Sequence, residues 1–201
     1  MAEEEKIVEA EETKDETKKE TKEQKVRSFL WELFTNSLFL LAVLVLTLLL
    51  VKYVGQRTVV IGQSMERTLF DGDNLIVDKI SYRFRDPERF DIIVFPFEYK
   101  EETYYIKRII GLPGEKVRID DEGRIYINGE VLEENYGIET IKDPGTAIDE
   151  VTLGDSQYFV LGDNRNHSSD SRTPSVGLID RKDIIGRAIV RIYPFNKIGG
   201  L

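Results

Sequence analysis

A serine and a lysine, Ser64 and Lys107, are the residues of this sequence best suited to chemistry. Ser64 lies on a short turn after an apolar stretch, and Lys107 lies within the run YYIKRIIG at 104–111. A serine hydroxyl becomes a strong nucleophile only when a nearby group accepts its proton, and a lysine amine does so only in its neutral form. Burial among apolar side chains disfavours the ammonium and lowers the lysine pKa from about 10.4. Taken singly, a serine after Gly is more often a turn former, and a lysine in a strand is more often an edge residue or one that reaches water. The pair suggests a serine nucleophile with a lysine base, and the sequence around it decides between these interpretations.

The competing arrangement is a Ser-His-Asp triad, for which the sequence offers a single histidine. His167 lies in a polar stretch, with Asp163 and Asp170 close to it along the chain. Triad members are brought together by the fold and not by adjacency in sequence. We therefore interpret His167 as a loop residue outside the catalytic machinery.

Composition excludes several function classes. The formal net charge is -9 and no basic stripe is present, so a nucleic-acid partner is not expected. The chain has no cysteine, which rules out disulfides and thiolate metal sites. The acidic stretches at 71–73 and 120–123 lack the twelve-residue ligand spacing of a calcium loop and are interpreted as turns. We expect neither a metal nor an organic cofactor.

The N-terminal part of the chain has two regions of opposite character. Residues 1–28 are mostly charged or polar, which predicts a disordered, charged tail. Residues 33–51 are almost entirely apolar and would span about 28 Å as a helix, which matches the core of a lipid bilayer. We therefore predict a single transmembrane signal-anchor helix over 29–54, with Trp31 and Tyr53 near its two interfaces.

The charges around this helix do not fix its orientation. Lys22, Lys25 and Arg27 precede the apolar run, and Lys52 and Arg57 follow it. Because the positive-inside rule depends on an imbalance of Lys and Arg, this near balance predicts neither direction.

The remainder of the chain, residues 55–201, reads as one β-rich domain. Asn128-Gly129 between two strand-like runs predicts a two-residue type I′ hairpin turn. Long helical patterns are absent from this part of the sequence, which favours a mostly β fold: an antiparallel, partly closed, β-barrel-like domain. The predicted strands are 58–61, 74–79, 91–95, 103–110, 116–119, 124–127, 158–161 and 184–193.

Four sequence blocks together resemble a known family. They are GQSMERTL at 62–69, RFDIIVF at 89–95, YIKRIIGLPGE at 105–115 and GDNRNHSSDSR at 162–172. Each block alone is weakly specific, but in this order they resemble the bacterial type I signal peptidases, over roughly three quarters of the chain.

The resemblance implies a function and a location. Members of the family are membrane-bound serine endopeptidases that remove N-terminal signal peptides from exported preproteins, with small residues at positions -1 and -3 of the cleavage site. For this chain it implies a single-pass protein of the plasma membrane, with the N-terminus in the cytoplasm and the catalytic domain outside it. The implied partners are preproteins, the lipid bilayer and the protein export channel.

The resemblance also assigns roles to residues. Ser64 would be the nucleophile and its backbone N–H an oxyanion donor, with Lys107 as the base. Ser168 would hydrogen-bond the Lys107 amine, Asp170 and Arg172 would form a supporting ion pair, and Asp163 and Arg165 match further motif positions. From the residues alone, we expect the substrate pocket to be lined by Ile61, Gln63, Met65 and Leu75.

Two positions depart from the family pattern. Arg67 stands where members commonly carry Pro, which removes a fixed φ from the turn after the nucleophile. Gly62 stands where some branches carry a hydroxyl that supplies a second oxyanion donor. The alternative hypothesis is a catalytically weak or inactive membrane-tethered β domain that acts in binding or assembly.

Residues 95–99 form an aromatic run next to a proline. Their aromatic side chains are candidates for contact with the lipid surface.

Overall fold

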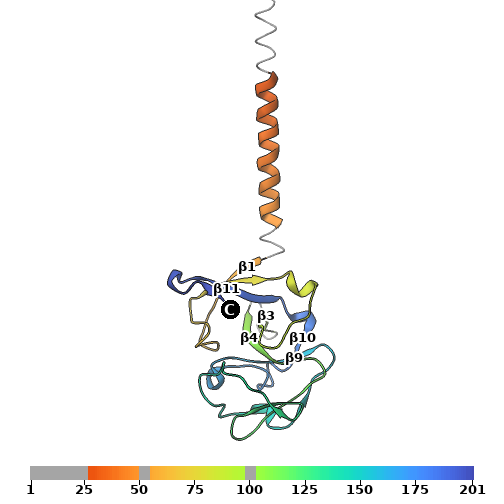
Figure 1. The fold of residues 1–201 in the computed structure, drawn as a ribbon, viewed down its shortest axis with the longest axis vertical. Helices are drawn as coiled ribbons and strands as arrows, with labels where there is room; N and C mark the ends of the chain where they lie inside the picture. The colour runs from red at the N-terminus through yellow and green to blue at the C-terminus, as the bar shows by residue number, and fades with distance from the viewer. Residues whose placement is uncertain (1–26, 50–54, 98–102) are drawn as a thin grey trace, which may run out of the picture. The chain divides into compact units, whose positions relative to one another are not determined.

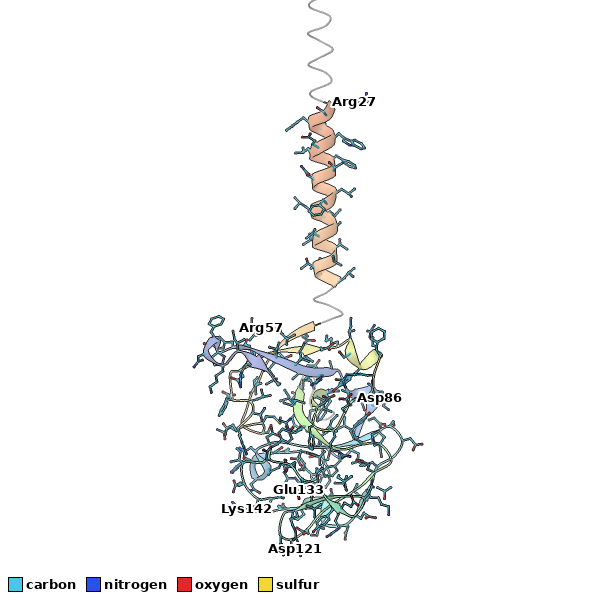
Figure 2. The ribbon with its side chains drawn as sticks, viewed as in Figure 1. Arg27, Arg57, Asp86, Asp121, Glu133 and Lys142 are labelled. Atoms are coloured by element: carbon cyan, nitrogen blue, oxygen red, sulfur yellow. The ribbon has the colours of Figure 1, made fainter. Side chains whose placement is uncertain are left out.

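The computed structural model describes residues 27–49, 55–97 and 103–201. The chain divides into two compact units, with the boundary after Leu50. The first unit contains a helix, Arg27–Leu49, of 23 residues that is long and apolar enough to cross a membrane. Large apolar side chains are exposed from one end of this helix to the other, as Figure 2 shows for the helix that begins at Arg27. Residues 1–26 and 50–54, and with them the expected tail and Tyr53, lie outside the described residues.

The second unit is built on two antiparallel β-sheets. The larger sheet has eight strands, and the order in space differs from the order in the chain, as the following bounds show. Its path runs β1 (Gly55–Val59), β2 (Asn74–Asp78), β11 (Gly186–Tyr193), β3 (Ile92–Pro96), β4 (Tyr104–Gly111), β9 (Gln157–Leu161) and β10 (Ile179–Asp180), and β12 (Gly199–Gly200) pairs with β11. Figure 1 shows β11 crossing the domain with β3 and β4 below it.

The smaller sheet lies at the end of the domain away from β1 (Figure 1). Its strands follow the order β7 (Glu130–Val131), β6 (Ile125–Ile127), β5 (Lys116–Ile119) and β8 (Val151–Thr152). The predicted hairpin turn is confirmed, because Asn128 and Gly129 join β6 to β7 with φ values of 52° and 88°. Five short 3₁₀ turns connect the strands: η1 (Ser81–Arg83), η2 (Gly145–Ile148), η3 (Arg165–His167), η4 (Arg181–Asp183) and η5 (Phe195–Lys197).

The mostly β, antiparallel class is as predicted, but the barrel-like closure is wrong. The larger sheet ends at β1 on one side and at β10 on the other, and within the described residues these two strands do not pair. The sheet is therefore open. The short strands β8, β10 and β12 were not predicted, because two residues carry too little periodicity to be recognised.

Strand β4 connects the two sheets and carries Lys107. Its last residue, Gly111, packs so closely against the smaller sheet that a Cβ there would lie 2.6 Å from Val117 and 2.8 Å from Leu153. Only glycine fits this approach. Most of β4 is buried, so the side chains of its middle residues are held away from water on both faces.

The aromatic run at 95–99 does not form an exposed patch in the described residues. Phe95 is buried in the core, and the ring of Phe97 stacks on Tyr105 with 4.6 Å between ring centroids. Residues 98 and 99 lie outside the described residues. Pro96 is the last residue of β3, in agreement with the expectation that it ends a strand.

Candidate active site

Ser64 lies on a tight turn, residues 62–69, between β1 and β2. The backbone N–H groups of Thr68 and Leu69 both donate to the Met65 carbonyl, and Glu66 N–H donates to the Gln63 carbonyl. The side chains of Met65 and Leu69 are buried and anchor the turn in the core. The Ser64 hydroxyl is left at the surface of the domain, half-buried.

Lys107 lies in the middle of β4, opposite Ile93 of β3. Its Nζ is 2.8 Å from Ser64 Oγ and also donates to the Ile106 carbonyl at 3.0 Å. The residue is 3% exposed. Burial lowers the pKa of the Lys107 amine from 10.5 to about 8, although the charges of Asp170 and Asp163 act in the opposite direction. About a tenth of the amine is therefore neutral at pH 7 and about half at pH 8, within hydrogen-bond distance of a hydroxyl.

Asp163 is fully buried and holds three segments together. Its carboxylate accepts two hydrogen bonds from Arg108, at 2.9 and 2.7 Å, and one from the Thr68 hydroxyl at 2.5 Å. Arg108 follows Lys107 on β4, and Thr68 belongs to the 62–69 turn, which we call the nucleophile turn after the role predicted for Ser64. Arg108 and Thr68 were not predicted as site residues. Arg108 lies in the same largely apolar run as Lys107, which is the one signal that could have pointed to it.

Asn164 was also not predicted, and it holds the nucleophile turn directly. Its backbone N–H donates to the Ser64 carbonyl at 3.0 Å, and its side-chain Nδ2 donates to the Gln63 carbonyl at 3.1 Å. The preceding Gly162 packs against the same turn, since a Cβ there would lie 2.4 Å from the Ser64 carbonyl oxygen. The 162–172 loop is thus seated on the turn that carries the hydroxyl.

The expected ion pair between Asp170 and Arg172 is present in the core of this loop. Arg172 Nε and Nη2 donate to the two oxygens of Asp170 at 2.8 and 2.9 Å, and Asp170 also accepts from the Gly162 N–H at 3.1 Å. Arg165 lies in the same loop and donates through Nε to the Gly162 carbonyl at 3.1 Å. These contacts lie within the loop and hold its residues to one another.

Ser168 does not make the hydrogen bond expected of it. Its Oγ is buried without a partner among the described residues, and it packs against Gly162. The Lys107 amine instead donates to Ser64 and to the Ile106 carbonyl. The hydroxyl therefore lies in the site as an unused hydrogen-bonding group.

A cleft of about 530 Å³ opens beside the Ser64 hydroxyl. Ile61 and Gln63 line it, as expected, and Ile61 is 89% exposed. Met65 and Leu75 do not line it, because both side chains are buried in the core, 1% and 0% exposed. The remaining walls come from two chain segments, 58–60 and 103–107, and from Gly62, Val94, His167 and Ser169.

His167 is exposed at the wall of this cleft. Neither acidic neighbour is free to orient it, because Arg108 occupies Asp163 and Arg172 occupies Asp170. This geometry supports the interpretation of His167 as a residue outside a triad. Within the described residues, no cluster of three or more His, Asp or Glu side chains is arranged to hold a metal ion.

The two departures from the family pattern lie on either side of Ser64, and both have positive φ. Arg67 has φ 81°, which a proline ring cannot adopt, so the turn takes a shape here that proline would not allow. Gly62 has φ 92° and donates its N–H to Asp71 Oδ1 at 2.7 Å. A side chain at position 62 would be strained in this conformation.

Comparison with known proteins identifies the family. The family model described as signal peptidase, peptidase S26, matches residues 30–193. The chain is 44% identical over 152 residues to a probable signal peptidase I-2 of Synechocystis, covering 73% of this chain and 67% of the relative. It is 45% identical over 156 residues to a signal peptidase I of Leptolyngbya laminosa, covering 74% of each.

Among solved structures, a signal peptidase I from Enterococcus faecalis V583 aligns with a TM-score of 0.43 and 36% identity, covering 51% of this chain and 97% of that one. The family match extends over most of the sequence, and it includes most of the helix, the nucleophile turn and the loop that holds it. This chain belongs to the signal peptidase family, peptidase S26.

Proposed function

We propose that this protein is a membrane-tethered serine endopeptidase that removes N-terminal signal peptides from exported preproteins, with Ser64 as nucleophile and Lys107 as base. Membership of the peptidase S26 family supports the reaction class. The single observation that carries the residue assignment is the 2.8 Å distance between Lys107 Nζ and Ser64 Oγ in a site where the lysine is buried.

The reaction begins with proton transfer from Ser64 Oγ to the neutral Nζ of Lys107 as Oγ attacks the scissile carbonyl carbon. The oxyanion of the tetrahedral intermediate accepts a hydrogen bond from the Ser64 backbone N–H, which has no other acceptor among the described residues. The Lys107 ammonium then gives its proton to the leaving amine, and the acyl-enzyme remains. Neutral Lys107 next takes a proton from water, whose oxygen attacks the ester carbonyl carbon. As the bond between that carbon and Ser64 Oγ breaks, the Lys107 ammonium returns the proton to Oγ, which regenerates both residues and releases the acid product.

The substrate peptide would lie extended in the cleft between the 58–63 and 103–107 segments. Strand β1 pairs with β2 on one side only within the described residues, so its other edge offers backbone groups to a peptide. Ile61 and Gln63 are retained as wall residues, and we propose that the cleft admits small side chains at -1 and -3. A preprotein with Ala at -1 should be cut, whereas Leu or Phe at -1 should abolish cleavage; efficient cutting after either would contradict this specificity.

The apolar helix and the family together support a membrane location. We propose a charged cytoplasmic tail over 1–28, a signal anchor over 29–54 in the plasma membrane, and an extracytoplasmic peptidase domain over 55–201. The lipid bilayer then holds enzyme and preprotein at the same surface. The protein export channel is a further partner, since preproteins emerge from it.

The deciding experiment measures cleavage of a preprotein with an Ala-Xaa-Ala site by the detergent-solubilised protein. Ser64→Ala and Lys107→Ala should each abolish cleavage while the melting temperature shows that the domain remains folded. Intact preprotein with folded wild-type protein would instead favour a binding or assembly role for the β domain.

A further inference from the structure

One segment outside both sheets contacts β4, the 162–172 loop and the nucleophile turn. It comprises residues 134–142, which leave β7 and lead to η2 without regular secondary structure. We call it the 134–142 segment. Nothing in the sequence motifs singles it out, and its contacts become visible only in the folded chain.

The first contact is with β4, beside the lysine. The ring of Tyr136 lies under the Arg108 guanidinium, with Cζ 3.7 Å from the ring centroid, and it packs against Phe90 at 5.0 Å. Arg108 also donates to the Phe90 carbonyl at 3.0 Å. A guanidinium held between an aromatic face and a buried carboxylate has one orientation, so Tyr136 fixes how Arg108 meets Asp163.

The second contact is with the 162–172 loop. Glu134 Oε1 pairs with Arg165 at 2.8 Å, with side chains only 10% and 3% exposed, and Ile138 N–H donates to the Asp163 carbonyl at 3.2 Å. Asn166 then exchanges two hydrogen bonds with the far end of the segment, at the Thr140 carbonyl and the Lys142 N–H. The first half of the 162–172 loop is thereby attached to the 134–142 segment.

The third contact is with the nucleophile turn. Arg67, three residues after Ser64, donates from Nη1 to the Gly137 carbonyl at 3.1 Å. The positive φ of Arg67 is uncommon for a residue with a side chain. The bond to Gly137 gives this residue a partner in the conformation that the turn adopts.

We propose that the 134–142 segment is a positioning element of the catalytic site, with Tyr136 holding Arg108 and Asp163 in register beside Lys107 and Arg67 tethering the nucleophile turn. This inference rests on the proposed function. The segment touches no reacting atom, and it acts by keeping the hydroxyl and the amine at bonding distance, where a displacement of about 1 Å costs up to about a hundredfold in rate.

The segment also influences the proton affinity of the base. The Asp163 charge raises the Lys107 pKa, and Arg108 neutralises that charge only while the two remain paired. Loss of the Tyr136 ring frees Arg108 to move, which leaves the Asp163 charge less well compensated. The Lys107 pKa then rises, and the activity profile shifts toward alkaline pH.

The test compares Tyr136→Leu with Tyr136→Phe in the full-length, detergent-solubilised enzyme. Tyr136→Leu should lower kcat by roughly tenfold or more with KM nearly unchanged, and it should move the acidic limb of the pH profile to higher pH. Tyr136→Phe, which keeps the ring, should retain the wild-type kcat and pH profile. The matched control is Tyr126→Leu, because the Tyr126 ring lies under Arg118 at 4.5 Å in the smaller sheet and this change removes a stack of the same kind. Equal kinetics for Tyr136→Leu and wild type, or equal loss in the Tyr126 control, would overturn the proposal.

A second pair of variants tests the tether without disturbing the core, because Arg67 is exposed. Arg67→Gly keeps the positive φ available but removes the donor, and it should lower kcat several-fold; Arg67→Lys retains a donor and should recover part of it. Unchanged kcat in Arg67→Gly would remove Arg67 from the proposal.

The Lys107 titration, followed by NMR of its side chain, separates the two proposals. If wild-type protein fails to cleave a preprotein, the proposed function is wrong, yet an upward shift of the Lys107 pKa in Tyr136→Leu still supports the positioning role. Cleavage by wild type with no shift and no kinetic change in Tyr136→Leu removes the positioning role alone.

Discussion

Lys107 is a buried amine whose charge state is set by its surroundings. Lowering its pKa from 10.5 to about 8 corresponds to about 3 kcal/mol of preference for the neutral form. Burial supplies this preference, and the nearby Asp163 and Asp170 limit it. Because both carboxylates are themselves paired with arginines, their effect on the amine is reduced and the neutral form remains accessible.

The first prediction is a pH dependence of cleavage. Since attack requires neutral Lys107, kcat/KM should fall about tenfold for each pH unit below about 8 and level off above it. A rate profile of the solubilised enzyme between pH 6 and 10 checks this. A profile that levels off near pH 6 would point to a different base.

The second prediction concerns stability. Between pH 8 and 10.5 the unfolded chain binds a proton at Lys107 that the folded chain does not, so this residue makes stability rise with pH across that window. Below about pH 8 the buried group is a charged ammonium, so its full burial cost lowers the unfolding free energy. Lys107→Met should therefore raise the unfolding free energy at pH 7 by about 1 to 3 kcal/mol and have little effect above pH 10.5.

Denaturant unfolding at the two pH values measures this difference. Lys182→Met on the exposed surface serves as the control and should change stability little at either pH. An equal effect of Lys107→Met at both pH values would contradict the burial argument.

The end of β9 and the loop that follows it hold the nucleophile turn in place. Leu161 pairs with Arg108 of β4, and the next residues place Gly162 against the Ser64 carbonyl and Asn164 within bonding distance of the same group. The distance between hydroxyl and amine is therefore fixed by three separate elements: the turn, strand β4 and this loop. The loop needs glycine at its first position because no Cβ fits there.

The third prediction is that Gly162→Ala displaces the nucleophile. The added Cβ would lie 2.4 Å from the Ser64 carbonyl oxygen and 2.3 Å from Ser168 Oγ, so the turn must move. We expect kcat/KM to fall by about a hundredfold or more. Gly199→Ala, where a Cβ meets nothing within 4 Å, is the matched control and should retain wild-type activity.

Kinetic assays of both variants, together with their melting temperatures, separate displacement of the turn from unfolding. Full activity in Gly162→Ala would mean that the loop accommodates a side chain by moving away from Ser64.

The molecule combines an apolar helix with a β domain that has its own core. The core clusters of the domain are built from residues between Val60 and Ala188 and include no residue of the helix. The helix leaves large apolar side chains uncovered along its length, which a bilayer would cover.

The fourth prediction addresses topology. The chain has no cysteine, so a single introduced thiol reports on one position only. In intact cells a membrane-impermeant maleimide should label Asp121→Cys on the exposed surface of the domain, and should label Lys18→Cys only after the cells are made permeable. The reverse pattern would place the β domain in the cytoplasm and contradict the proposed orientation.

Local patterns in the sequence were sufficient to predict the helix, the hairpin turn and most long strands. A continuous apolar run, an Asn-Gly dipeptide and β-branched clusters each act over a few residues, so they can be read without knowing the fold. Ser64 and Lys107 were singled out by residue type and local setting, but such residues are usually structural, and the four ordered sequence blocks around them carried the prediction.

Contacts between distant segments were beyond such patterns. Met65 and Leu75 were expected at the cleft and lie in the core, because the direction of a side chain depends on what the rest of the chain packs against it. Arg108 pairs with Asp163, and Asn164 holds the nucleophile turn, although these residues are far apart in sequence. The Ser168 hydroxyl has no partner among the described residues, and the larger sheet stays open, because of how distant segments pack. Each follows from close packing of several segments at once, which folding in three dimensions establishes and a linear pattern does not contain.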